Sequence, residues 1–307
     1  MNLKQAITTA GIGLAALALA ACGANSDPLA ESSPPTSQPG GAAIVVGSAN
    51  FTENQILAEI YSQALVAKGV TSSTKPNIGS REVYIKALQD KSISIVPEYT
   101  GNLLQYFDKS TTATTAEEID AALPKAVGTD LRVLKASEAA DQDVYVVTKA
   151  FAEKNGIASL DDLKKVSATA TLGGPSELKD RAYGPPGLES IYGAKFKSFK
   201  PYDSPAVKVK DLNDDKIQVA TFFTTDAAIL DNGYVPLTDP QSMILPQNVV
   251  PLVRSDVADN PTAVSALEAV QAALTTEELT VLNKSVDVER KDANAVAGEW
   301  LKSKGLA

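Results

Sequence analysis

The sequence predicts an α/β fold in which mainly parallel sheets are covered by helices on both faces. From residue 43 onward, short apolar runs rich in β-branched residues alternate with segments whose apolar residues recur at helical spacing. Such alternation is typical of strand–helix–strand units and therefore of parallel sheets. From Asn260 to the end, the Ala/Leu/Val pattern predicts two or three helices and no further strand.

The first strand and the helix after it are clearly marked. Ile44, Val45 and Val46 form a compact apolar run, and Thr52 is the expected N-cap of the next helix, with Gln55 completing a capping box. Further helices are predicted at 80–91, 116–127, 159–166 and 175–184. Further strands are predicted at 92–101, 131–136, 143–149, 167–174, 216–226 and 248–257.

The composition excludes several classes of function. The chain has 307 residues and no histidine, which rules out Ser-His-Asp and Cys-His catalysis and any imidazole metal site. Its formal net charge is -9 and its cations are not clustered, so we expect no nucleic-acid partner. We also expect no cofactor, no metal and no enzymatic activity.

The N-terminus predicts an exported lipoprotein. Residues 1–21 combine a short basic start with an apolar core and small residues, which is typical of a signal peptide. The segment "LAACG" matches a bacterial lipobox, so Cys22 is the expected site of acylation; a plain secretory signal with a stray cysteine is the alternative. Residues 22–42 are rich in Pro, Ser and Gly and are interpreted as a flexible tether. The predicted location is extracytoplasmic, with the membrane reached through the lipid.

The loop after the first strand is a candidate binding element. Ligands of open α/β sheets sit beyond the carboxyl ends of the strands, and Gly47-Ser48-Ala49-Asn50 lies at such an end. The helix that follows presents unpaired N–H groups in its first turn. An ordinary strand–helix connection is the alternative, so the loop alone does not decide.

Four segments together resemble a known family. These are "VGSANFTENQILAEIYSQAL", "VPEYTGNLL", "SELKDRAYGPPGLESIYG" and "FFTTDAAIL", in this order. As an ordered set they are similar to the substrate-binding proteins of ABC importers for quaternary ammonium osmoprotectants, the ProX/OpuCC type. The resemblance covers residues 43 to about 255. It implies a receptor that captures a solute such as glycine betaine and delivers it to the transmembrane subunits of an ABC permease, acting as a monomer.

The resemblance also implies a two-lobed periplasmic-binding-protein fold of type II, with the ligand cleft between the lobes. We place lobe I at 43–146 and 248–307, and lobe II at 147–247. The crossings are expected near 145–147 and 246–249.

The ligand's chemistry explains which residue types matter. A trimethylammonium group has no N–H to donate, but aromatic faces attract its charge by about 0.5–2 kcal/mol per contact. A betaine carboxylate requires Arg, Lys or backbone N–H donors. By resemblance, Tyr99 and Tyr145 are cage tyrosines, Asp143 faces the cation, and Arg181 grips the carboxylate. The remaining ligand-binding candidates are Asn50, Phe51, Asn102, Phe223 and Gln247.

Three positions depart from the family pattern. Ala49 replaces a lysine that assists the carboxylate, and Gln247 replaces an aromatic wall of the cage. Phe223 replaces a tyrosine and keeps its aromatic face. These changes leave open a neutral aromatic or polyhydroxylated ligand for the same receptor. Less favoured alternatives are an envelope docking lipoprotein and a hydrolase that uses Glu98 and Asp226 as its carboxylate pair.

Overall fold

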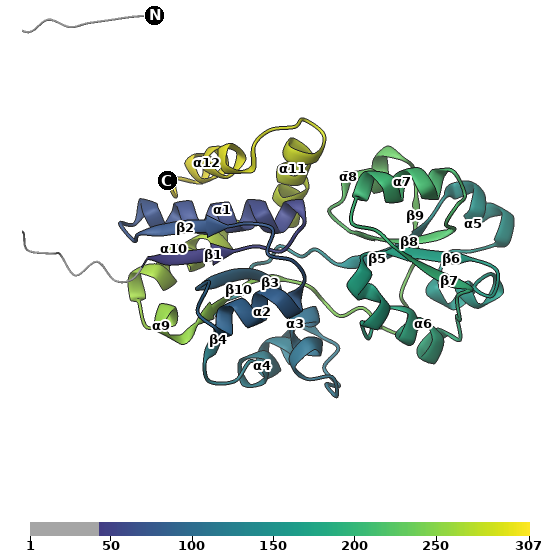
Figure 1. Cartoon of the computed structure of the whole chain (residues 1–307), viewed down its shortest axis with the longest axis horizontal. Helices are drawn as coiled ribbons and strands as arrows, with labels where there is room; N and C mark the ends of the chain where they lie inside the picture. The colour runs from purple at the N-terminus through teal and green to yellow at the C-terminus, as the bar shows by residue number, and fades with distance from the viewer. Residues whose placement is uncertain (1–42) are drawn as a thin grey trace, which may run out of the picture. The chain divides into compact units, whose positions relative to one another are not determined.

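The computed structural model describes residues 43–307. The predicted signal peptide over 1–21, the acylation site Cys22 and the tether over 22–42 lie outside the described residues. Within the described part, two five-stranded sheets each form the centre of a lobe (Figure 1). Every helix among residues 43–307 is too short or too polar to cross a membrane.

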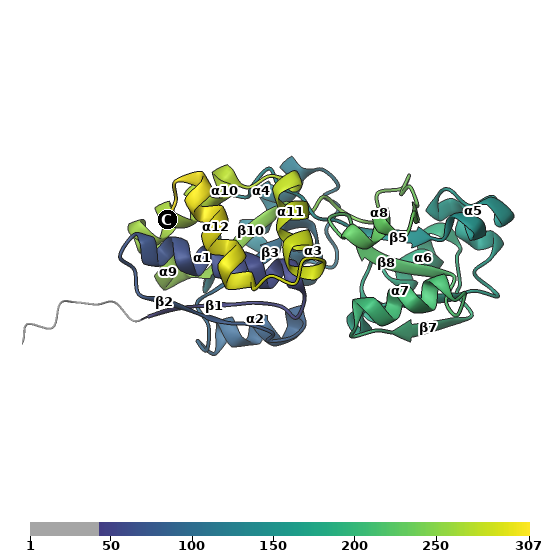
Figure 2. The same cartoon turned by 90° about the horizontal axis from the view of Figure 1, so that it is seen from above.

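The first lobe combines the N-terminal third of the chain with its C-terminal end. Its strand order is β2 (Ser72–Lys75), β1 (Ile44–Gly47), β3 (Ile95–Tyr99), β10 (Val249–Arg254) and β4 (Leu131–Val133). One face carries α1 (Thr52–Ala67), α9 (Ser255–Ala258), α10 (Pro261–Ala273), α11 (Thr276–Asp287) and α12 (Ala293–Lys304). The other carries α2 (Arg81–Gln89), α3 (Thr100–Phe107) and α4 (Ala116–Ala126). Figure 2 shows α12 and α11 lying beside α1, although they come from opposite ends of the chain.

The second lobe repeats this arrangement with other residues. Its strand order is β7 (Ser198–Pro201), β6 (Thr171–Gly174), β8 (Val219–Phe223), β5 (Asp143–Val147) and β9 (Val235–Pro236). One face is covered by α5 (Lys149–Asn155), the 3₁₀ helices η1 (Leu160–Lys165) and η2 (Ser176–Asp180), and α6 (Pro185–Tyr192). The other is covered by α7 (Pro205–Asn213) and α8 (Ala227–Asp231).

Both faces of each sheet are apolar, and the strand period of two explains how. In β5, Tyr145 and Val147 enter the core under α6, whereas Val144 and Val146 enter the core under α7. A strand buried on both faces is continuously hydrophobic, as β5 is from Val144 to Val147. The four resulting cores hold the cleft-facing strand ends in place.

The predicted two-lobed α/β fold is confirmed, and in each sheet four strands run in one direction while one strand runs against them. In the first sheet, β10 runs antiparallel to both β3 and β4; in the second, β5 runs antiparallel to both β8 and β9. Strands β1 and β3 end at the cleft. Strands β5 and β10 each follow a crossing between the lobes and therefore begin at the cleft. Each runs in the direction opposite to the strands of its sheet that end there.

Two local expectations are wrong. Strand β5 pairs with the second sheet over its whole length, so lobe I, predicted at 43–146, runs four residues too far. Phe51, not Thr52, is the N-cap of α1, and it makes no side-chain cap hydrogen bond. The Thr52 hydroxyl instead donates to Asp287 of α11 at 2.6 Å, so tertiary packing outweighs the local capping preference.

Candidate functional site

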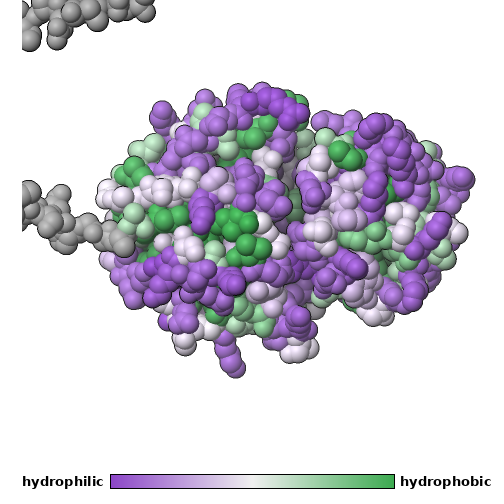
Figure 3. Space-filling model, viewed as in Figure 1, coloured by the Kyte–Doolittle hydropathy of each residue, from purple (hydrophilic) through white to green (hydrophobic). Residues whose placement is uncertain are grey.

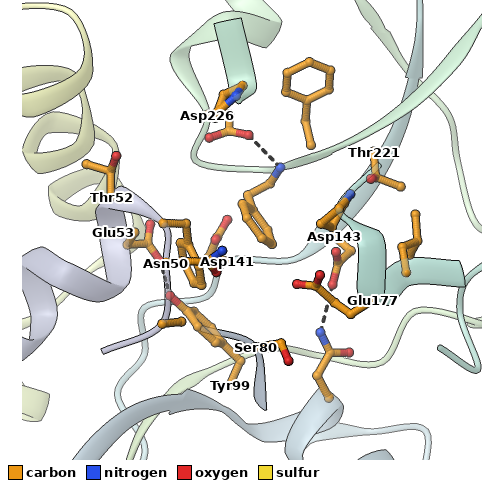
Figure 4. Close-up of a pocket in the computed structure, with 18 of the residues that line it drawn as sticks. Asn50, Thr52, Glu53, Ser80, Tyr99, Asp141, Asp143, Glu177, Thr221 and Asp226 are labelled. Carbon is orange, nitrogen blue, oxygen red and sulfur yellow. Dashed lines mark hydrogen bonds between the residues drawn. The ribbon is translucent and has the colours of Figure 1, made fainter. Parts of the chain in front are cut away.

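A cavity of about 290 Å³ lies between the two lobes, at the cleft-facing ends of strands from both sheets. The face drawn in Figure 3 is hollowed between the two halves. Close up, Glu53 and Tyr99 lie on the first-lobe side of the cavity, and Asp143, Thr221 and Asp226 on the second-lobe side (Figure 4). A solute in this position would touch both lobes.

Most of the residues predicted from the sequence line this cavity. Seven of the nine ligand-binding candidates do so: Asn50, Phe51, Tyr99, Asn102, Asp143, Arg181 and Phe223. Tyr145 and Gln247 are not among the lining residues.

The loop after β1 is built to be small. A Cβ on Gly47 would lie 2.6 Å from Ile93 Cδ1 and 2.7 Å from Ile78 Cδ1, so only glycine fits without rearrangement. The next residues are tied down by hydrogen bonds. The Ser48 carbonyl accepts from Ile78 N at 2.9 Å, and the Asn54 side chain accepts from Ala49 N at 2.7 Å. The loop is therefore a fixed platform that holds Asn50 and Phe51 at the cavity.

Three aromatic rings from the two lobes meet at the cavity. The Phe51 ring centroid lies 6.1 Å from that of Tyr99 and 5.0 Å from that of Phe223, with tilted ring planes. Phe51 and Tyr99 belong to the first lobe, whereas Phe223 ends β8 of the second. A hydrogen bond from Phe223 N to the Asp226 carboxylate, at 2.9 Å, fixes the turn that carries this ring.

Tyr145 lies beneath the site rather than in it. Its side chain is 1% exposed, and its hydroxyl donates to the carbonyl oxygen of Tyr183 at 2.6 Å. Asp143 faces the cavity, and Tyr145 is two residues further along the same face of β5. Tyr183 lines the cavity, whereas Tyr145 does not. Tyr183 is the residue that the sequence interpretation missed here.

Gln247 is fully buried and acts on Asn102. Its Oε1 accepts from Asn102 N at 3.0 Å, and its Nε2 donates to Asn102 Oδ1 at 2.7 Å. Asn102 in turn donates to Asp143 Oδ2 at 2.8 Å, which links α3 of the first lobe to β5 of the second. Burial raises the pKa of Asp143, and this hydrogen bond opposes the rise. Gln247 thus positions a lining residue and is not itself a wall of the cavity.

Arg181 reaches across the cleft instead of standing free. Its guanidinium donates to both carboxylate oxygens of Glu82 on α2, at 2.6 and 3.2 Å. Among the atoms described for residues 43–307, Arg181 Nε is buried without a hydrogen-bond partner. The resemblance assigns Arg181 to a ligand carboxylate, but both of its Nη groups are directed to the protein's own glutamate.

Glu53 is a site residue that the sequence interpretation quoted but did not single out. Its carboxylate accepts from Tyr99 Oη at 2.7 Å, from Asn283 Nδ2 at 2.7 Å and from Thr225 Oγ1 at 2.8 Å. Thr225 belongs to the second lobe, so Glu53 holds the two lobes together. Burial raises the pKa of Glu53, and these three hydrogen bonds oppose the rise. Asn283 comes from α11, and no sequence signal pointed to it.

Asp141 is a second acid that was missed, two residues before β5. It is 3% exposed, and its Oδ1 accepts from Thr225 N at 3.1 Å and from Thr224 Oγ1 at 3.2 Å. Within the described chain, its Oδ2 has no hydrogen-bond partner. Burial raises the pKa of Asp141 well above its ordinary value, and the charge of Glu53 adds to the rise.

The cavity as a whole is acidic. Three cations line it among the described residues, Arg81, Arg181 and Lys208, against seven carboxylic acids: Glu53, Asp141, Asp143, Glu177, Asp203, Asp226 and Asp287. Glu98, one half of the alternative hydrolase pair, is not a lining residue; it is ion-paired with Arg81 at 2.7 Å. The lining therefore suits a cation better than it suits paired-carboxylate chemistry.

Comparison with known proteins identifies the family. Residues 42–303 match the family described as the substrate binding domain of ABC-type glycine betaine transport systems. The chain belongs to this family of transport substrate-binding domains. The resemblance predicted from the sequence is therefore confirmed, and membership assigns a role in solute transport.

Individual relatives agree in length and fold. The chain is similar to the glycine betaine-binding protein YehZ of Escherichia coli K12, with 29% identity covering 85% of this chain and 90% of YehZ. Identity to the glycine-betaine-binding protein of Pseudomonas aeruginosa PAO1 is 25%, and the match covers 85% of this chain and 88% of that protein. A solved structure titled as a glycine betaine/carnitine/choline ABC transporter superposes with a TM-score of 0.67 at 21% identity. The superposition covers 86% of this chain and 99% of that one.

Proposed function

We propose that this chain captures a quaternary ammonium solute of the glycine betaine type in the inter-lobe cavity and delivers it to the transmembrane subunits of an ABC permease. The single observation that carries the proposal is the trio of Phe51, Tyr99 and Phe223. These rings come from both lobes of an acidic cavity, and the Phe51 centroid lies 5.0 Å from that of Phe223 and 6.1 Å from that of Tyr99. Family membership supports the same role.

The aromatic trio supplies what this ligand class needs. A methylated ammonium offers no hydrogen to donate, so its recognition depends on the negative faces of aromatic rings. Phe223 stands where the family pattern has a tyrosine, but it keeps the aromatic face on which such a contact depends.

The carboxylates around the trio favour a cation over a neutral aromatic or polyhydroxylated ligand. Asp141 and Glu53 are buried beside other acids, and burying a carboxylate without a nearby cation costs free energy. A positively charged ligand would offset this cost by favouring their ionised forms, whereas a neutral sugar or aromatic would not. The acidic lining is therefore explained by a cationic ligand and has no such explanation for a neutral one.

Closure of the lobes would couple binding to delivery. Contacts already join the lobes through Thr225 to Glu53, Asn102 to Asp143 and Arg181 to Glu82. A ligand held by rings of both lobes would add to these contacts and shift the equilibrium between open and closed forms toward the closed one.

The N-terminal pattern completes the proposal. The lipobox at Cys22 supports an anchor on the outer face of the cytoplasmic membrane, with the binding domain acting as an extracytoplasmic monomer. Substitution of Cys22→Ala should move the protein from the membrane fraction to the soluble fraction, as measured by immunoblotting. Unchanged membrane association of the variant would argue against the anchor.

Titration calorimetry with glycine betaine and with choline tests the binding role. Each ring contributes about 0.5–2 kcal/mol, so the double variant Phe51→Ala/Phe223→Ala should bind about 5- to 900-fold more weakly than wild type. Phe151→Ala is a matched control, because Phe151 is a partly buried ring of the second lobe that does not line the cavity. Equal affinity in the double variant and the control, or no binding of either ligand by the wild type, would contradict the proposal.

A further inference from the structure

Glu82 holds the donors that a zwitterionic ligand would need. Its carboxylate accepts from both Nη atoms of Arg181, at 2.6 and 3.2 Å, and from Ser80 Oγ at 2.7 Å. Burial alone would raise the pKa of Glu82, but the hydrogen bonds from Arg181 and Ser80 hold it at about 2. The glutamate is therefore ionised at every physiological pH, and its charge is always present beside Arg181.

The other two cations of the lining also have partners. Arg81 donates from Nε and Nη2 to the two oxygens of Glu98, at 2.7 and 2.8 Å. Lys208 donates to the carbonyl oxygen of Thr221 at 2.6 Å and lies 4.1 Å from the centre of the Phe222 ring. Neither residue replaces the donor that is absent at Ala49, since each is already engaged within the protein.

The unpartnered groups around the cavity include two acceptors, one donor and one hydroxyl. In the described part of the chain, Asp141 Oδ2 and Asn283 Oδ1 are buried acceptors without a hydrogen-bond partner, and Arg181 Nε is a buried donor without one. Among the same residues, Thr221 Oγ1 is also unpartnered, and a hydroxyl can donate or accept. All four residues line the cavity. Buried polar atoms in folded proteins are almost always satisfied, so the two acceptors indicate a ligand that brings positive charge or a donor to their part of the site.

We infer that Glu82 is a specificity-determining residue: by occupying Arg181 and Ser80 it supplies from the protein the carboxylate that a betaine would bring. The site then prefers a quaternary ammonium cation that carries no carboxylate, such as an ammonium alcohol. This inference rests on the proposed function and narrows its ligand class.

The physical reason is the repulsion between like charges in a partly buried site. A betaine carboxylate would have to displace Glu82 from Arg181 or lie beside an ionised glutamate among several other acids, and both are unfavourable. The Arg181 side chain is 14% exposed and that of Glu82 is 49% exposed, so Glu82 can swing into solvent once its interaction is outcompeted. The effect is therefore a preference between ligands rather than an absolute exclusion.

Paired titrations of choline and glycine betaine test the inference. Wild-type protein should bind choline at least about 10-fold more tightly than glycine betaine. In Glu82→Ala, which frees Arg181 and Ser80, glycine betaine should gain affinity relative to choline. The dissociation constant of glycine betaine divided by that of choline should therefore fall at least about fivefold. Glu117→Ala, which removes an exposed glutamate of α4, is the matched control and should leave the ratio unchanged.

The ratio of the dissociation constants separates an effect on specificity from an effect on stability. A general loss of lobe closure would weaken the binding of both ligands alike and leave the ratio unchanged. Glu82→Gln, which keeps the shape of the side chain, provides a second variant if Glu82→Ala unfolds, and circular dichroism verifies the fold of each. A wild-type preference for glycine betaine, or a ratio that does not change in either variant, would overturn the inference alone. Failure of the wild type to bind either ligand would overturn the proposed function and the inference together.

Discussion

Two buried glutamates flank Tyr99, and they are compensated in opposite ways. Glu98, on the α2 side, receives two hydrogen bonds from the Arg81 guanidinium and one from Tyr84 Oη at 2.8 Å. Glu53, on the α1 side, receives only neutral donors, from Tyr99, Thr225 and Asn283. Within residues 43–307, no cationic side chain forms an ion pair with Glu53.

The difference distinguishes a structural charge from a functional one. A buried carboxylate with a paired guanidinium is electrostatically complete and has no further use for a ligand. A buried carboxylate with only neutral donors, next to the unpaired oxygen of Asp141, keeps part of its desolvation cost and is stabilised further by any cation that enters. The cavity lies beside Glu53, and Glu98 does not line it.

The largest expected effect follows from removing the cation that is paired with Glu98. Arg81→Met would leave Glu98 buried and unpaired, which should lower the free energy of unfolding by about 3–5 kcal/mol in urea titrations. Arg132→Met, at an exposed position, should change the free energy of unfolding by at most about 0.5 kcal/mol. The double variant Arg81→Met/Glu98→Gln should recover much of the loss, because the unpaired charge is gone. Equal losses in the single and double variants would show that packing, not charge, dominates.

Glu53 and Asp141, buried acids without a paired cation among the described residues, should make ligand affinity depend on pH. Burial and the charge of Glu53 raise the pKa of Asp141 in the free protein, while a bound cation favours its ionised form. Binding therefore releases protons. Affinity for a quaternary ammonium ligand should rise with pH from about 4 up to the raised pKa, by at most about tenfold per pH unit. Because the folded chain holds this proton more tightly than the unfolded chain, stability should fall over the same window.

Calorimetry between pH 5 and 8 measures this slope. Asp141→Asn should flatten it, although Glu53 and Asp226 still titrate nearby. Asp130→Asn, at an exposed position outside the cavity, should leave the slope as in wild type. A slope that persists unchanged in Asp141→Asn would assign the proton release to another group.

The smallest effect is expected at Tyr145. Its buried hydroxyl donates to a backbone carbonyl, whereas the hydroxyl of Tyr99 donates to the Glu53 carboxylate. Tyr145→Phe removes the hydrogen bond to Tyr183 and should cost about 0.5–1.5 kcal/mol of stability in urea titrations. Ligand affinity measured by calorimetry should stay within about twofold of wild type. An affinity loss above about fivefold would instead make Tyr145 part of the site.

Local patterns predicted the elements that carry their own signals. The strand at Ile44 and the helix from Thr52 were both found, because apolar spacing and strand length are properties of contiguous residues. Helix α3 was missed, since a strand was predicted as far as residue 101 and α3 begins at Thr100. Its cleft end is fixed from elsewhere in the chain: a Cβ on Gly101 would lie 2.5 Å from the Pro246 carbonyl oxygen.

The candidate site was predictable to the extent that its residues sit at strand ends. Tyr99 and Phe223 end β3 and β8, and Phe51 follows β1, so their positions at the cavity follow from the α/β pattern together with the family resemblance. Tyr145 and Gln247 lie close to cleft residues in the sequence, but their side chains are buried, form hydrogen bonds to Tyr183 and Asn102, and do not line the cavity.

The sequence by itself determined that this chain has no imidazole chemistry, that it alternates strands and helices, and that aromatic and acidic residues stand near the ends of its strands. Only the tertiary structure decided which charges are left without a counter-charge. Asn283 reaches Glu53 across 230 positions of the chain, and Glu82 reaches Arg181 across 99. Backbone periodicity is set by neighbours in the sequence. Charge compensation acts over a few ångströms in space, and that distance is fixed only when the lobes have folded and met.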